Sequence, residues 1–124
     1  MSLLNLKCEY GRTIALNPAK AALVCIDFQR DFVSRDGMAA SLGSPVEQLL
    51  SALSAAGVAL DVARQLGMLV VHTREVYAPD LSDLNPVRRQ SGSIVGTAGP
   101  LGRFLVRGER GTLSTRRDRW QASQ

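Results

Sequence analysis

Residues 21–27 read Ala-Ala-Leu-Val-Cys-Ile-Asp, an apolar run that ends in a carboxylate. An apolar run without alternation is typical of a strand covered on both faces, as in parallel sheets. A second run, Met-Leu-Val-Val, occupies residues 68–71, and apolar side chains recur at helical spacing over residues 44–66 between the two runs. The order strand, helix, strand predicts a right-handed βαβ unit with parallel strands.

The predicted helix has recognisable ends. Ser44-Pro45-Val46-Glu47 matches a capping box, in which Ser44 caps the helix, Pro45 is its first residue and Glu47 bonds back to the Ser44 amide. Gly67 is placed for a left-handed turn that ends the helix. The predicted apolar face consists of Val46, Leu49, Leu50, Leu53, Leu60 and Ala63.

Length and composition narrow the class of protein. The chain has 124 residues, of which 45% are hydrophobic and 21% charged, values typical of one soluble globular domain. No apolar run approaches the roughly 20 residues that span a bilayer, and no secretory signal is visible at the N-terminus. Two cysteines do not suggest a disulfide framework. We therefore expect a cytoplasmic protein without a membrane span.

The regular pattern weakens after Asp83. Residues 85–86 and 91–100 are rich in Asn-Pro, Ser-Gly and Gly-Pro sequences, which predict a long surface loop. Residues 101–105 are compatible with a short helix within it. No internal repeat is visible.

Several stretches resemble the isochorismatase-like cysteine hydrolases. Residues 25–32, Cys-Ile-Asp-Phe-Gln-Arg-Asp-Phe, match a first strand that ends in Asp and is followed by an aromatic residue, Gln and Asp-Phe. Further matches are residues 63–75, the run Pro-Asp-Leu-Ser-Asp at 79–83, and the glycine-containing residues 99–103 and 107–109. The likeness covers about residues 18–111 and is greatest for the biuret-hydrolase branch, which cleaves small ureido and amide compounds.

The resemblance implies an α/β fold: a three-layer α/β/α arrangement with a parallel Rossmann-like sheet, of which this chain supplies only the N-terminal portion. Residues 1–109 would be the N-terminal part of that hydrolase domain. Residues 110–124 would be an atypical Arg/Ser-rich tail, which we expect to be disordered.

Asp27 is the candidate catalytic residue. Ligands of parallel sheets bind beyond the carboxyl ends of the strands, where Asp27 is expected to lie; a helix cap or a loop hydrogen-bond acceptor is the structural alternative. The family's Asp–Lys–Cys triad attacks a carbonyl carbon with the thiolate, moves protons with the aspartate and supports the charge with the lysine. Asp27 matches that aspartate, Phe32 matches an aromatic residue that walls the substrate pocket, and Gln29 is close enough to help position substrate.

The sequence contains no residues that match the other two members of the triad. Its only lysines are Lys7 and Lys20 and its only cysteines are Cys8 and Cys25, and all four precede Asp27, whereas the family's Lys and Cys follow the Asp. Cys25 is expected to be a buried structural thiol rather than a displaced nucleophile. The sequence therefore predicts an amidohydrolase of C–N bonds by family that is catalytically incomplete as it stands.

Metal, cofactor and partner expectations follow from the same comparison of residues. The single histidine, His72, lacks the Asp-x-His pattern and the further His with which related nicotinamidases bind a metal, so neither a metal nor a cofactor is expected. The expected partner is a small amide or ureido substrate, and the full-length family implies a homo-oligomer.

The C-terminal residues leave a second interpretation open. Residues 1–87 carry seven Lys/Arg and nine Asp/Glu, while residues 88–124 carry eight Arg and two acidic residues. Such a basic end can bind nucleic acid, but Trp120 is its only aromatic residue after Phe104. Arg/Ser-rich ends are also typical of GC-rich genes read out of frame, and we favour that frameshift or truncation. A binding or regulatory fragment, or a gene remnant, is the non-enzymatic alternative.

Overall fold

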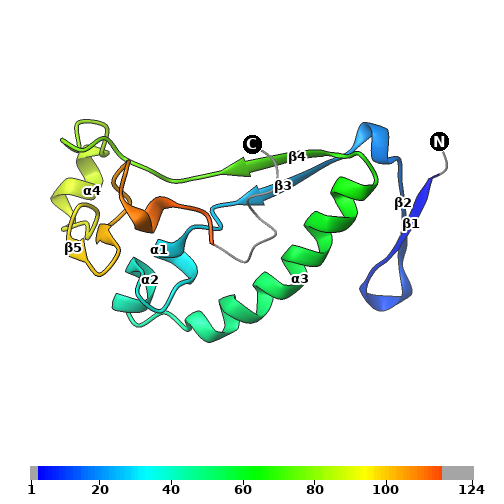
Figure 1. Ribbon diagram of the computed structural model, residues 1–124, viewed down its shortest axis with the longest axis horizontal. Coiled ribbons are helices and arrows are strands. Elements are labelled where there is room, and N and C mark those ends of the chain that lie inside the picture. The colour runs from blue at the N-terminus through cyan, green and yellow to red at the C-terminus, as the bar shows by residue number, and fades with distance from the viewer. Residues whose placement is uncertain (1–2, 116–124) are drawn as a thin grey trace.

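The computed structural model describes residues 3–115 (Figure 1). Its strands are β1 (Leu4–Lys7), β2 (Thr13–Leu16), β3 (Ala22–Ile26), β4 (Leu69–Thr73), β5 (Ala98–Gly99) and β6 (Gly102–Arg103). Its α-helices are α1 (Arg30–Val33), α2 (Met38–Ser41), α3 (Val46–Gln65) and α4 (Pro86–Gln90). Its 3₁₀ helices are η1 (Glu9–Gly11), η2 (Pro18–Lys20) and η3 (Arg110–Thr112).

The predicted βαβ unit is confirmed. β3 and β4 pair in parallel, with Ala22 opposite Leu69 and Ile26 opposite Thr73, and α3 crosses one face of this pair (Figure 1). Gly67 has a φ of +66°, as expected for the left-handed turn that ends the helix. The carboxyl ends of β3 and β4 therefore lie side by side, which brings the residues after Ile26 and Thr73 together.

A small apolar core joins α3 to the sheet. Leu60 of α3 is completely buried and packs with Cys25 of β3, and partly buried residues surround this pair: Leu23, Phe28, Ala56 and Val70. Of the predicted apolar face, Val46, Leu53, Leu60 and Ala63 are buried, whereas Leu49 is exposed. By length and composition alone α3 would also pass for a membrane span, as many core helices do.

The beginning of α3 differs from the prediction. The helix begins at Val46, and no side chain caps it; instead, the Ser44 carbonyl accepts a bond from the Val46 amide at 2.8 Å. Glu47 does not reach back, because Arg35 binds both of its carboxylate oxygens at 2.7 and 2.9 Å. The capping box was therefore a wrong prediction: an ion pair with the preceding loop uses the carboxylate that the box requires.

The segment after Asp83 is more ordered than predicted. It contains α4, and residues 101–105 form β6 and a turn rather than a helix, because Gly102 pairs with Gly99 of β5. The segment also carries a second core, in which the buried residues are Met38, Leu84, Val95, Phe104 and Leu105. The prediction of a surface loop is thus wrong for the apolar residues of this segment, because they pack against α2 and against one another.

The N-terminal hairpin was not predicted. β1 and β2 pair antiparallel, with Leu4 opposite Leu16 and Leu6 opposite Ile14, so four aliphatic side chains share one face. The hairpin stands beyond the amino end of β3, at the opposite end of the molecule from α4 (Figure 1).

Candidate active site at the carboxyl end of β3

Asp27 directly follows β3, and a side chain from the end of β4 holds it. The Thr73 hydroxyl oxygen accepts a bond from the Asp27 amide at 3.1 Å and donates to Asp27 Oδ1 at 2.8 Å. Asp27 has a φ of +55°, a conformation that is uncommon for residues other than glycine and is tolerated best by Asp and Asn. Strained backbone of this kind is frequent at functional sites. The half-buried carboxylate thus lies at the sheet edge where ligands bind in parallel folds.

Gln29 is buried without any exposed surface. Its side-chain amide donates to the Glu75 carbonyl at 2.9 Å and accepts from the Glu75 amide at 2.7 Å. These two bonds therefore extend the hydrogen-bonded pairing of β3 and β4 beyond the ends of both strands. A substrate would have to displace one of these two bonds to reach the Gln29 amide.

Phe32 lies on α1 and is partly buried. It packs against the second core, the cluster that includes Leu84 and Phe104. The chain therefore places Asp27, Gln29 and Phe32 on one continuous segment, with the carboxylate and the amide both facing the end of β4.

Asp31 was not predicted as an important residue, yet it joins three segments. Its carboxyl group is 1% exposed, and Oδ2 accepts a bond from the Leu105 amide at 2.9 Å. Within the described residues Oδ1 has no hydrogen-bond partner, and the carboxylate lies directly against Gly111. Burial raises the pKa of Asp31, and the backbone amides of Leu105 and Met38 offset this only in part.

This raised pKa predicts a pH dependence of stability. Because the folded protein holds the Asp31 proton more tightly than the unfolded chain, the contribution of Asp31 is fully present below its ordinary pKa of 3.8 and is lost as the pH rises through the folded value. The wild-type protein should therefore lose stability relative to Asp31→Asn between about pH 4 and neutrality. Urea unfolding of both proteins across this range measures the difference, and Asp36→Asn, at an exposed site in the loop that follows α1, is the matched control. A difference that is constant with pH, or that grows, contradicts the prediction.

Glu75, Tyr77 and Arg88 form a polar cluster next to Gln29. Glu75 Oε1 accepts bonds from the Tyr77 hydroxyl at 2.6 Å and from Arg88 Nη1 at 2.7 Å. Although burial raises the pKa of Glu75, these two bonds lower it on balance. The cluster ties α4 to the segment after β4 and so fixes the backbone to which Gln29 binds.

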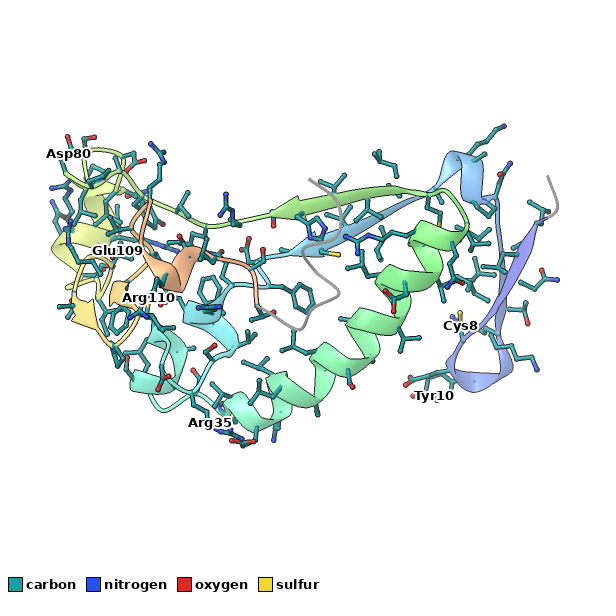
Figure 2. All side chains as sticks on the ribbon, viewed as in Figure 1. Cys8, Tyr10, Arg35, Asp80, Glu109 and Arg110 are labelled. Carbon is teal, nitrogen blue, oxygen red and sulfur yellow. The ribbon has the colours of Figure 1, made fainter. Side chains whose placement is uncertain are left out.

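The two cysteines differ in exposure and position. Cys25 is buried against α3, and this burial raises the pKa of its thiol, with the charge of Arg64 acting in the opposite direction. The thiol is thus poorly suited to form a thiolate. Cys8 is exposed on the hairpin, at the other end of the molecule from Glu109 and Arg110 (Figure 2).

His72 lies in β4 opposite Cys25. Burial lowers its pKa, and so does the charge of Arg64. Within residues 3–115, no three His, Cys, Asp or Glu side chains are grouped closely enough to hold a metal ion.

Several arginines of the basic C-terminal region bind the protein itself. Arg103 donates to the carbonyls of Gly96 and Pro79 at 3.1 and 2.8 Å, and Arg110 donates to the Pro100 carbonyl at 3.0 Å. Arg88 is committed to Glu75 as described above. These guanidinium groups therefore stabilise the loops between β4 and η3, which leaves fewer of them for nucleic acid.

The first residues of the predicted tail are ordered. The Leu113 carbonyl accepts a bond from the Arg30 amide at 3.0 Å, and the Thr115 amide donates to the Phe28 carbonyl at 2.9 Å. Residues 110–115 thus run beside the segment that carries Asp27, contrary to the expectation of disorder for this part. Residues 116–124 lie outside the described residues, and the interpretation of that part remains a prediction.

Sequence reasoning located Asp27 but missed the residue that holds it. The signal was available, because parallel pairing of β3 with β4 places the polar residues that end the two strands next to each other. Thr73 belongs to the His-Thr-Arg-Glu sequence at 72–75, and a search for side-chain donors in that stretch would have identified it.

Comparison with known families identifies the family to which the βαβ unit and the candidate site belong. A family model described as the isochorismatase domain matches residues 21–108, a span that runs from the start of β3 through the βαβ unit and α4 to Gly108. The predicted α/β fold and the likeness to isochorismatase-like hydrolases are confirmed by this match, and the family indicates a hydrolase of the cysteine hydrolase type. The chain belongs to the isochorismatase family.

Proposed function

We propose that this chain carries the aspartate of a cysteine hydrolase site that acts on amide or ureido C–N bonds of small molecules, as in the biuret-hydrolase branch. The observation that supports this most directly is the position of Asp27, held by Thr73 at the carboxyl end of β3. In such a reaction a thiol attacks the carbonyl carbon, and the carboxylate takes the thiol proton and returns it to the leaving nitrogen. Phe32 is the proposed aromatic wall of the pocket. For Gln29 we propose a supporting role, because both of its amide atoms are already bound.

We further propose that the 124 residues do not complete this reaction by themselves. The chain has no lysine or cysteine after Asp27, Cys25 is buried, and Cys8 lies on the distant hairpin (Figure 2). A proton acceptor without a nucleophile can bind an amide but cannot cleave it. Binding without chemistry is accordingly the second function that the same geometry supports.

The purified protein should release no ammonia from biuret above the rate in buffer. Biuret should nevertheless shift the amide NMR signals of residues around Asp27, because its N–H groups can donate to the carboxylate, and Asp27→Ala should abolish these shifts. Asp36→Ala removes an exposed carboxylate from the neighbouring loop and should leave the shifts unchanged. Ammonia release that disappears in Asp27→Ala but persists in Asp36→Ala would show that the chain is catalytically complete. Shifts that survive in Asp27→Ala would remove Asp27 from the proposed site.

A further inference from the structure

The two carboxylate oxygens of Asp27 are not equivalent. Thr73 binds Asp27 twice, because its hydroxyl oxygen accepts from the Asp27 amide at 3.1 Å and donates to Oδ1 at 2.8 Å. A hydroxyl has a single proton, so accepting the amide bond leaves that proton directed at Oδ1. Within residues 3–115, no hydrogen bond to Oδ2 is found. Thr73 therefore occupies Oδ1, and no other residue among 3–115 binds Oδ2.

A second contact fixes the distance between the two strand ends. The backbone amide of Gln29 donates to the Asp27 carbonyl at 2.8 Å. The side-chain amide of Gln29 donates to the Glu75 carbonyl at 2.9 Å and accepts from the Glu75 backbone amide at 2.7 Å. Asp27 and Thr73 are thus held from both sides: by the β3–β4 pairing before them and by the Gln29–Glu75 pair after them. This arrangement can maintain the φ of +55° at Asp27, a backbone conformation that is unfavourable for residues other than glycine.

We propose that Thr73 is a positioning residue that reserves Oδ1 of Asp27, so that Oδ2 is the oxygen that accepts a hydrogen from a bound amide. Gln29 holds the two strand ends in the register that this contact requires. The inference rests on the proposed function in one respect only: the ligand is taken to be an amide or ureido compound whose N–H group can donate. It does not depend on whether the chain cleaves that compound.

Thr73→Val tests the proposal, because valine has nearly the shape of threonine but neither donates nor accepts a hydrogen bond. Thr73→Ser is the conservative variant that should restore the contact. Thr112→Val is the matched control, since Thr112 is buried, whereas Thr73 is partly buried, and likewise loses a hydroxyl bond, here of 2.7 Å to the Glu109 carbonyl. The readouts are amide hydrogen exchange, the ¹³C NMR signal of the Asp27 carboxyl carbon, and the shift of that signal on titration with acetamide.

In Thr73→Val the Asp27 amide should exchange at least tenfold faster, while the amides within β3 keep their wild-type rates. The carboxyl signal should move, and its response to acetamide should fall several-fold, because either oxygen can then rotate away from the ligand. Thr73→Ser should behave as the wild type, and Thr112→Val should leave all three readouts at Asp27 unchanged.

Two results would overturn the proposal. The first is a Thr73→Val protein in which exchange at Asp27 and the carboxyl signal are unaltered. The second is equal acceleration of all β3 amides, or an equal effect of Thr112→Val, since Thr73 would then only stabilise the fold. None of these readouts depends on ammonia release, so the proposal on Thr73 and the proposed function can fail separately.

Discussion

Replacing Gly111 by alanine should destabilise the protein by about 3 kcal/mol or more. A Cβ atom at Gly111 would overlap with Asp31 Oδ1 and would lie 2.5 Å from both Cγ and Oδ2 of that residue. Asp31 cannot move aside, because it is 1% exposed and the Leu105 amide binds its Oδ2 at 2.9 Å. Relief would require η3 to move away from α1, which would break the bond between the Arg30 amide and the Leu113 carbonyl. Urea unfolding monitored by circular dichroism measures the loss.

Gly57→Ala is the control for the same change of side chain. Gly57 lies inside α3, and no atom outside the local helix backbone lies within 4 Å of a Cβ built there. Because alanine is the better helix former, Gly57→Ala should stabilise the protein by up to about 1 kcal/mol. A Gly111→Ala protein as stable as the wild type would show that residues 110–115 do not pack on Asp31. In the double variant with Asp31→Ala the two losses should be less than additive.

The βαβ unit was predictable because its signals are local. The continuous apolar runs of β3 and β4 and the helical period of α3 each identify one element, and Gly67 sets the short turn between helix and strand. The βαβ order then determines parallel pairing. No feature of that prediction required knowledge of contacts between distant residues.

The second core could not be predicted in the same way. Phe104 and Leu105 lie among glycines in a segment without any period, and their burial depends on α2 and on Leu84, which are distant in the sequence. The capping box failed for a related reason, since the pairing of Glu47 with Arg35 is a tertiary contact that competes with a local one. Pattern analysis detects the local option only.

The candidate site likewise has one part that local sequence signals predict and another that depends on contacts between distant residues. Asp27 was found from the end of an apolar run, which is a local signal. The role of Gln29 was not found in this way. Its side-chain amide binds the backbone of Glu75, which is 46 residues away in the sequence, and this contact depends on how the ends of β3 and β4 meet. The sequence identified the residue that is proposed to react, and the structure was needed to identify those that hold it.

The protein should self-associate as its concentration rises. α3 covers one face of the β3–β4 pair, while the exposed large apolar residues of the pair are Val24, Ile26, Leu69 and Val71. In the described residues both outer strand edges of this pair are also unpaired. Contiguous apolar surface and open strand edges favour association with a second copy of the chain. Sedimentation velocity over a range of concentrations should therefore show a dimer or larger species.

Ile26→Thr combined with Leu69→Thr should weaken this association by about a hundredfold or more. The two side chains are 66% and 65% exposed, so burying the exposed part of each contributes about 1 kcal/mol per copy, and a symmetric dimer loses that contribution from both copies. Threonine has the β-branched shape that strands favour, so neither substitution should disrupt β3 or β4. The matched control is Leu42→Thr with Val87→Thr, since these residues are 60% and 70% exposed but lie outside the sheet. A wild-type protein that remains monomeric at high concentration and unfolds in one sharp, cooperative thermal transition would contradict the prediction. Equal weakening by the control pair would place the contact elsewhere on the surface, because only the first pair removes apolar area from the face that α3 leaves open.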